Sequence, residues 1–186
     1  MENFLALLII VVLLFVFIGS IISIYNRLVF LKNNTDKSYA NIDVLLKQRV
    51  DEIPNLVEVV KQNANYEQTT LDKLTKLRTD FLNATSTDEK VNLSNEMNKT
   101  LKSIFAISEN YPTLQANQAF LTLQNRVSQI EDAISDRREF FNDSVSLYNT
   151  GIQSFPNVIF SKMLGYNERK FLQISEEETK YEGVKF

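Results

Sequence analysis

The residues best placed to do chemistry are polar side chains on two long stretches of helical periodicity. Carboxylates such as Asp43 and Asp143 could act as general acids or bases if the fold paired them. If the two helices run antiparallel, their polar sets could instead face each other as a buried or half-buried layer that fixes register and helix pairing. We favour this inter-helix polar layer, whose members are Asn41, Asp43, Arg49, Arg137, Arg138, Asn142 and Asp143.

Other kinds of chemistry lack the residues they need. The 186 residues include no Cys and no His, which removes the thiolate nucleophile, the usual general base near neutral pH and the commonest zinc ligand. The acidic run at residues 176–178 lacks the spacing of a calcium loop. A net charge of −3 argues against nucleic-acid binding. The sequence therefore predicts a protein that is not an enzyme and that needs no metal or cofactor.

The element before these polar residues is an apolar stretch at residues 4–24. It reads FLALLIIVVLLFVFIGSIISI and contains no charged side chain. As a helix it would be about 31 Å long, close to the hydrocarbon thickness of a bilayer. A cleaved signal peptide would need basic residues in front of it, and residues 1–3 contain no Lys or Arg. We expect a short flank at 1–3 and a transmembrane anchor at 4–24, continuous with the helix that follows.

The charges on either side of the anchor predict its orientation. Arg27, Lys32 and Lys37 follow the apolar stretch, and no basic side chain precedes it. The positive-inside rule then places the N-terminus outside and the rest of the chain in the cytoplasm. We expect a single-pass protein of a bacterial-type cell membrane.

Residues 25–150 have the apolar spacing of an all-α protein. Steps of three and four predict a first helix to about residue 63, with a kink at Pro54. Two shorter helices are expected at 66–82 and 88–109, separated by a polar loop whose residue 85, 86 or 87 caps the second. A fourth helix should begin with Pro112 in its first turn and end near Gly151 and Pro156. Together they predict an elongated antiparallel bundle of four helices with coiled-coil-like seams.

The tail at residues 151–186 is expected to be irregular, apolar at first and acidic later. Its apolar part is too short to span a membrane. It could contact a neighbouring subunit, a partner or the membrane interface, or it could fold back onto its own bundle. We favour an oligomer or partner contact made by Phe155, Pro156, Val158, Ile159, Phe160, Met163, Leu164 and Tyr166.

Blocks spread over nearly the whole chain carry a resemblance to a known family. They include Ile53-Pro54-Asn55-Leu56-Val57, Tyr111-Pro112-x-Leu114-x-Ala116-Asn117, Asn142-Asp143-x-Val145-x-x-Tyr148-Asn149 and Phe155-Pro156-Asn157. In this order they resemble LemA family proteins. The chain departs from the family pattern with Tyr39 for Trp, Tyr66 for His, Phe141 for Tyr, and Glu131-Asp132-Ala133 for Glu-Asn-Arg. A role resting on that His or that Arg does not carry over to this chain.

The resemblance implies a single-pass protein of the bacterial cell envelope with an antiparallel helical bundle. Some relatives occur with HtpX-type membrane zinc metalloproteases, and one takes part in building magnetosome membranes. Two hypotheses follow for this chain. The first is a non-enzymatic homo-oligomeric scaffold on the membrane surface, with lipid bound through the anchor. The second is an adaptor or regulator of a membrane partner such as an HtpX-like protease.

Overall fold

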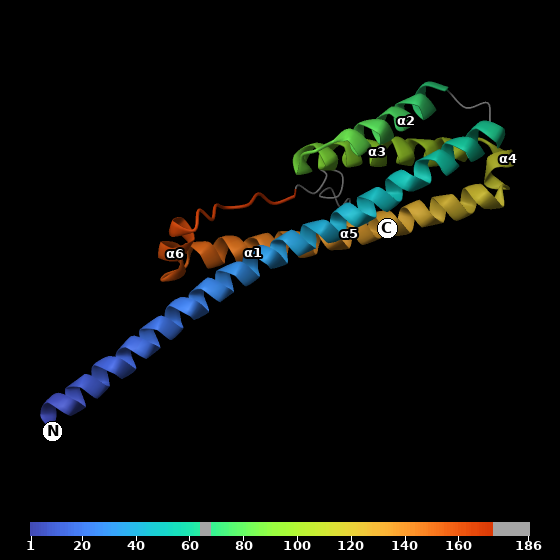
Figure 1. Ribbon diagram of the computed structural model, residues 1–186. Helices are drawn as coiled ribbons and strands as arrows, with labels where there is room; N and C mark the ends of the chain where they lie inside the picture. The colour runs from blue at the N-terminus through green and yellow to red at the C-terminus, as the bar shows by residue number, and fades with distance from the viewer. Residues whose placement is uncertain (64–67, 173–186) are drawn as a thin grey trace, which may run out of the picture. The chain divides into compact units, whose positions relative to one another are not determined.

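The computed structural model of the chain describes residues 1–63 and 68–172 (Figure 1). Within these ranges every regular element is a helix, which confirms the all-α prediction. The acidic run at 176–178 and Tyr66 lie outside the described residues. The helices are α1 (Glu2–Asn63), α2 (Gln68–Asn83), α3 (Thr87–Ser108), α4 (Pro112–Gln115), α5 (Gln118–Gln153) and α6 (Asn157–Met163).

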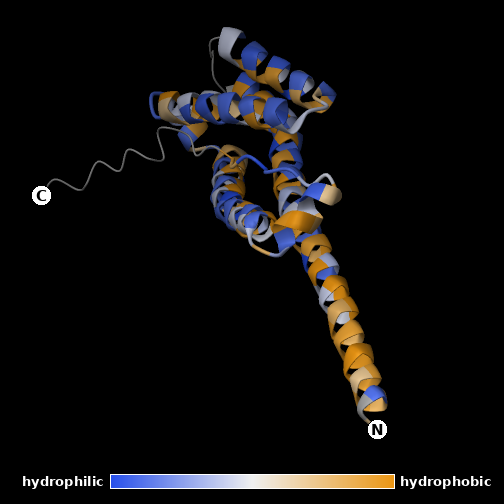
Figure 2. Cartoon of the chain, turned by 90° about the vertical axis from the view of Figure 1, so that its left-hand side faces the viewer, coloured by the Kyte–Doolittle hydropathy of each residue, from blue (hydrophilic) through white to orange (hydrophobic). Residues whose placement is uncertain are grey.

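Helix α1 contains the apolar stretch at its N-terminal end. It runs for 62 residues and passes through Pro54 without interruption, so the kink expected there stays a prediction. Its apolar part is long enough to cross a membrane and none of the span is buried in the protein. Figure 2 shows this end of α1 as almost uniformly hydrophobic. A core helix of a soluble protein would be covered by its neighbours, and this stretch is not.

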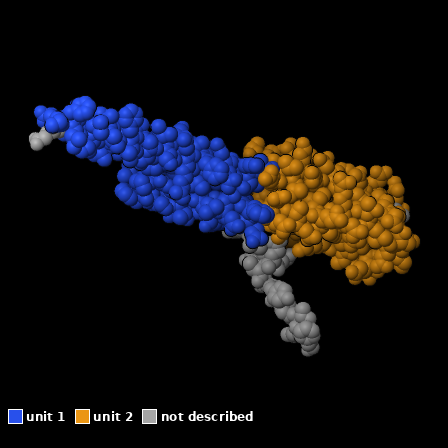
Figure 3. Space-filling view, turned by 90° about the horizontal axis from the view of Figure 1, so that it is seen from below, with its two compact units in different colours: residues 1–40, 139–171 blue, residues 41–138, 172–186 orange. Residues whose placement is uncertain are grey.

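The chain divides into two compact units, coloured separately in Figure 3. Unit 1 consists of residues 1–40 and 139–171. Unit 2 consists of residues 41–138 and, among the described residues, Leu172. Both α1 and α5 contribute residues to each unit.

In unit 1, the α1 and α5 segments run antiparallel. Thr35 donates a hydrogen bond to the Ser144 carbonyl at 3.3 Å, and further along, Leu28 packs with Tyr148 and Ile152. The Tyr39 ring meets Phe141 edge to face at a centroid distance of 5.9 Å, so both aromatic departures from the family pattern keep a packing role.

Helix α5 ends at Gln153, between Gly151 and Pro156 as expected, and Gly151 lies inside its last turn. The reason for a glycine there is close packing. A Cβ atom at position 151 would lie 2.3 Å from Leu31 Cδ1. Only a residue without a side chain allows α5 to approach α1 this closely with Leu31 in its present rotamer.

In unit 2, α2 and α3 form a helical hairpin whose two helices pack along each other. The Ser86 side chain accepts a hydrogen bond from the Glu89 amide at 3.2 Å and caps the start of α3. The unit's core is aliphatic, with Phe120 as its most deeply buried ring. Fully buried members of this core include Ile42, Leu46, Leu56, Leu74, Met97, Leu101, Ile104 and Ile134.

Two short helices differ from the prediction. Pro112 begins α4, as expected of a first-turn proline, but α4 ends at Gln115 and α5 begins at Gln118. Asn117 explains the break, because its Oδ1 accepts hydrogen bonds from the amides of Ala119 and Phe120 at 2.9 and 3.1 Å. The second difference is α6, which lies in the tail that was expected to be irregular.

Candidate functional site

The most deeply buried charge in the described part of unit 2 is the guanidinium of Arg49 on α1, whose residue is 1% exposed. It forms an ion pair with Glu131 on α5. Its Nη2 donates to the Ser94 carbonyl on α3 at 2.9 Å and also to the Ser94 hydroxyl. Burial lowers the pKa of Arg49, Glu131 acts to raise it, and the nearby charge of Arg138 lowers it further.

Further polar side chains extend this cluster across three helices. Asn98 on α3 donates to the second oxygen of Glu131 at 2.7 Å. Arg138, also buried, donates to Asn95 on α3 at 2.9 Å. Hydrogen bonds of this kind have directional requirements that apolar contacts lack. The cluster therefore ties α1, α3 and α5 together in one relative register.

The predicted polar layer differs from this cluster in membership. Arg49 and Arg138 belong to the cluster. Asp43 pairs with Lys90 on α3 at 2.8 Å instead of facing α5. Asn142 is half-buried in unit 1. Side chains exposed to solvent cannot form a buried layer, and this applies to Asn41, Arg137 and Asp143.

The partners that sequence reasoning left out are Ser94, Asn95, Asn98 and Glu131. Ser94 lies three residues from both Val91 and Met97 on the buried face of α3. A small polar residue at the spacing of core residues was the signal in the sequence that Ser94 is buried. Without the position of α3 between the two long helices, that signal does not identify Arg49 as the partner.

The cluster offers little for acid–base chemistry. Its single carboxylate, Glu131, is engaged by Arg49 and Asn98. Among residues 1–63 and 68–172, no three His, Cys, Asp or Glu side chains are grouped to hold a metal ion. An open groove of about 470 Å³ lies beside α1 and α2, lined in part by Ile53, Pro54, Val57 and Arg78. The hydrogen bonds and the ion pair of the cluster are therefore suited to holding α1, α3 and α5 in place.

In unit 1 the tail is held by a pair of backbone hydrogen bonds to Asn149. The Asn149 side-chain Nδ2 donates to the Arg169 carbonyl, and its Oδ1 accepts from the Arg169 backbone N–H, both at 2.9 Å. The Arg169 guanidinium forms an ion pair with Asp36 at 2.6 Å and lies 5.2 Å from the centre of the Tyr148 ring. The tail thus returns along unit 1 in a defined position as far as residue 171.

The predicted tail contacts fall into two groups. Phe160 and Tyr166 pack on the core formed by Leu28, Tyr148 and Ile152, as the fold-back alternative expected. Val158 is half-buried, and Pro156 is exposed. Of the predicted tail residues, four large apolar side chains are exposed within unit 1, and we call them the α6 corner: Phe155, Ile159, Met163 and Leu164. Among the predicted contact residues, those of the α6 corner are the ones that leave a large apolar surface available for contacts outside unit 1.

The fold and the polar cluster define an all-α protein whose first helix is long and apolar enough to cross a membrane. The chain belongs to the LemA family, whose model matches residues 38–186. It is similar to "Magnetosome protein MamQ 2" of Paramagnetospirillum magneticum, with 25% identity over 183 residues, covering 84% of this chain and 67% of that protein. It is also similar to "Magnetosome protein MamQ" of Magnetospirillum gryphiswaldense, with 23% identity over 181 residues, covering 83% and 66%. The chain spans about two thirds of the length of these relatives.

Proposed function

We propose that the protein is a non-enzymatic scaffold, anchored in the membrane by residues 4–24 of α1 and assembled into a homo-oligomer on the membrane surface. The helix that would span the bilayer continues directly into the bundle. Because the anchor and the bundle share one continuous helix, contacts that fix the distance between two bundles would also fix the distance between their anchors. The similarity to magnetosome proteins, which are named for a membrane-bound organelle, supports a role at a membrane.

The observation that carries the assembly is a pair of solvent-exposed apolar side chains on α5. Phe140 and Leu147 are 59% and 60% exposed, and both belong to unit 1. They are seven residues apart, which places them on one side of the helix two turns from each other. Seven-residue spacing is also the repeat by which helices of neighbouring chains pack. Exposed apolar side chains grouped in this way are typical of protein contact surfaces.

The test is the particle mass of the full-length protein in mild detergent over a range of concentrations. A discrete particle several times the 21.5 kDa chain mass is expected, and Phe140→Ser with Leu147→Ser should reduce it to a single chain. Val44→Ser changes a comparably exposed apolar residue of unit 2 and serves as the control. A single-chain particle at every concentration for the unaltered protein would exclude the scaffold.

The alternative function is an adaptor or regulator of a membrane partner such as an HtpX-like zinc metalloprotease. The open groove beside Pro54 and Val57 favours it, because grooves with apolar walls are common docking surfaces. Under this alternative the protein would co-purify with a membrane protease at fixed stoichiometry, and Val57→Asp would release the protease. Gentle solubilisation that never recovers a protease would count against it.

The orientation is part of the same proposal. With Arg27, Lys32 and Lys37 retained inside, the N-terminus would lie outside a bacterial-type cell membrane and both units inside. The chain has no Cys, so Ser128→Cys creates a single labelling site on an exposed part of α5. In sealed right-side-out vesicles, an impermeant maleimide should label it only after the membrane is opened. Labelling in intact vesicles would refute this orientation and place residue 128 outside.

A further inference from the structure

Helix α6 has the reverse of the polarity expected of a surface helix. Its buried residues are polar: Asn157 donates to the Gly151 carbonyl at 3.0 Å, and Ser161 donates to the Ile152 carbonyl at 2.8 Å. Both carbonyls belong to the last turn of α5, where they have no partner within the helix. The polar face of α6 is therefore used internally.

Apart from Lys162, the exposed residues of α6 are apolar, and Phe155 just before the helix is apolar as well. Ile159 and Met163 are four residues apart on the side opposite Asn157 and Ser161. Phe155 is 82% exposed and Met163 is 79% exposed, which is more than any residue from Phe4 to Ile22 among the exposed apolar side chains of α1. Water is an unfavourable surrounding for such side chains, so this surface needs an apolar neighbour.

The place of α6 within unit 1 identifies that neighbour. The core that supports it includes Ile24, Leu28 and Leu31 of α1, together with Phe160 of α6 itself. Ile24 is the last residue of the apolar stretch, and Leu31 is about 10 Å further along the helix axis. The headgroup layer of a bilayer is about 5–7 Å thick beyond its hydrocarbon core. A helix packed at this level of α1 lies beside the headgroups of a membrane that α1 spans.

Side chains around this level are those that favour a membrane interface. Tyr25 is an exposed residue of α1, and tyrosine rings concentrate at the boundary between lipid and water. Arg27 is exposed, and Lys162 is exposed in the last turn of α6. Basic side chains in this position can reach lipid phosphates while their methylene groups stay in apolar surroundings.

We propose that the α6 corner is a second membrane contact, in which Phe155, Ile159 and Met163 enter the boundary between headgroups and acyl chains of the bilayer spanned by α1. This contact rests on the membrane anchor of the proposed function and is independent of assembly into an oligomer. A short element that inserts beside a transmembrane helix restricts the tilt and rotation of that helix. Unit 1 would then be fixed against the membrane at two points.

The test uses the full chain in vesicles of phosphatidylethanolamine and phosphatidylglycerol. Because the chain has no Cys, Ile159→Cys and Met163→Cys can each carry one environment-sensitive fluorophore. Quenching is measured with lipids that bear a nitroxide near the headgroup, with lipids that bear it at the acyl-chain end, and with aqueous iodide. We expect several-fold stronger quenching by the headgroup-proximal nitroxide than by the chain-end nitroxide, and little quenching by iodide.

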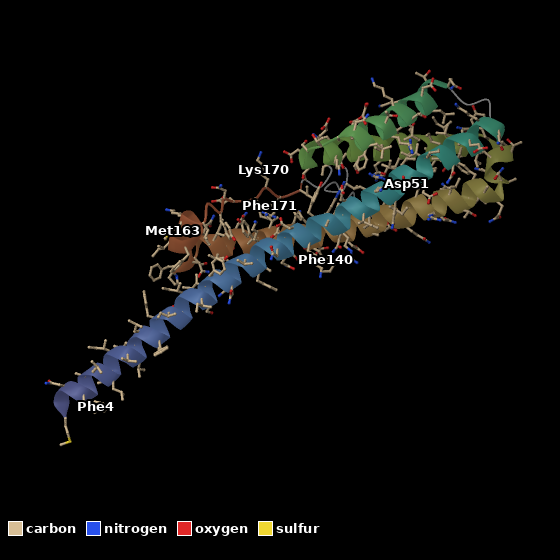
Figure 4. The ribbon with its side chains drawn as sticks, viewed as in Figure 1. Phe4, Asp51, Phe140, Met163, Lys170 and Phe171 are labelled. Carbon is tan, nitrogen blue, oxygen red and sulfur yellow. The ribbon has the colours of Figure 1, made fainter. Side chains whose placement is uncertain are left out.

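A matched control is Phe140→Cys, an equally apolar and exposed position in the same unit (Figure 4). Its neighbour Phe141 contacts Tyr39, which is about 22 Å along α1 from Ile24. A label there should be insensitive to either lipid nitroxide. Phe15→Cys, in the middle of the apolar stretch, should be quenched most by the chain-end nitroxide.

The outcomes separate this proposal from the proposed function. If the label at Phe15→Cys is not quenched by lipid, the anchor itself is refuted. If that label is quenched but those at 159 and 163 respond only to iodide, the α6 corner faces water and this inference fails. If the two labels escape all three quenchers, and lowering the protein-to-lipid ratio exposes them to iodide, a second copy of the chain covers the corner instead. Agreement of both labels with the headgroup-proximal pattern supports the lipid contact.

Discussion

Removing the carboxylate of Glu131 should destabilise the protein more than removing the guanidinium of Arg49. The two groups form one ion pair, but they differ in access to water, because the side chain of Arg49 is 1% exposed and that of Glu131 is 18% exposed. In Glu131→Ala the buried guanidinium loses its counter-charge, and Arg138 remains nearby. In Arg49→Met the remaining carboxylate can take up water and keeps its hydrogen bond from Asn98.

The size of this difference follows from the costs of burying charge. Removing one partner of a buried ion pair costs about 3–5 kcal/mol, while replacing the charge by an apolar side chain of similar volume is often close to neutral. Because Glu131 is partly exposed, we expect about 3 kcal/mol for Glu131→Ala. For Arg49→Met we expect about 1 kcal/mol, mainly from lost hydrogen bonds to Ser94. For a chain of this length, about 3 kcal/mol lowers Tm by roughly 6–12 °C.

The assay is denaturant unfolding of the detergent-solubilised chain followed by helical circular dichroism, with Tm measured at one scan rate. Glu96→Ala is the control, because Glu96 and its partner Lys73 are both about half exposed and 3.8 Å apart. It should leave stability unchanged, since exposed pairs contribute little. Equal losses for Glu131→Ala and Arg49→Met, or a larger loss for Arg49→Met, would refute the argument from burial.

Three further predictions concern packing, capping and ionisation. Gly151→Ala should cost no more than about 1 kcal/mol net in denaturant unfolding, because moving the Leu31 methyl away from the new side chain is offset by about 1 kcal/mol of helix propensity, and in a Leu31→Ala background the same substitution should be stabilising. Asn117→Ala should cost about 1 kcal/mol in the same assay and increase hydrogen exchange at the start of α5, because two capping bonds are lost. Burial raises the pKa of Tyr148, opposed by the charge of Arg169, so the unfolded chain releases this proton first and stability falls as pH rises above about 10. The alkaline loss of stability should be smaller in Tyr148→Phe, measured as the difference between the two unfolding curves against pH.

Much of the fold was predictable because apolar spacing identifies helices directly. The predicted limits of the two middle helices lie within two residues of α2 and α3. The break after α4 was not predictable from spacing, because Leu114 and Leu121 keep the seven-residue interval of one helix face across it. The chain turns there because the Asn117 side chain accepts hydrogen bonds from two backbone amides at the start of α5. An asparagine inside a helix looks the same in the sequence, so Asn117 alone does not predict the break.

The polar cluster shows a second limit of prediction from the sequence. Arg49 and Arg138 were among the predicted residues, but Arg137 has the same helical spacing between Ile134 and Phe141 and is exposed, so periodicity alone did not separate Arg137 from Arg138. The partners of Arg49 and Arg138 could not be assigned, because pairing depends on which face of α3 meets the two long helices. The prediction matched α1 with α5 alone, whereas α3 supplies Ser94 and Asn95. Local periodicity indicates which side chains are buried and leaves open what they bind.

Buried polar groups find partners on neighbouring helices in both units. Arg49 shows that a buried charge in this fold is matched by partners on two other helices. In the same way, the buried side chains of Asn157 and Ser161 donate hydrogen bonds to carbonyls at the end of α5. Because these polar side chains face inward, Ile159 and Met163 must face outward for the same helical geometry. The exposure of the α6 corner is therefore a consequence of how α6 is attached, and the proposed contact with a bilayer beside Ile24 would give these side chains apolar surroundings.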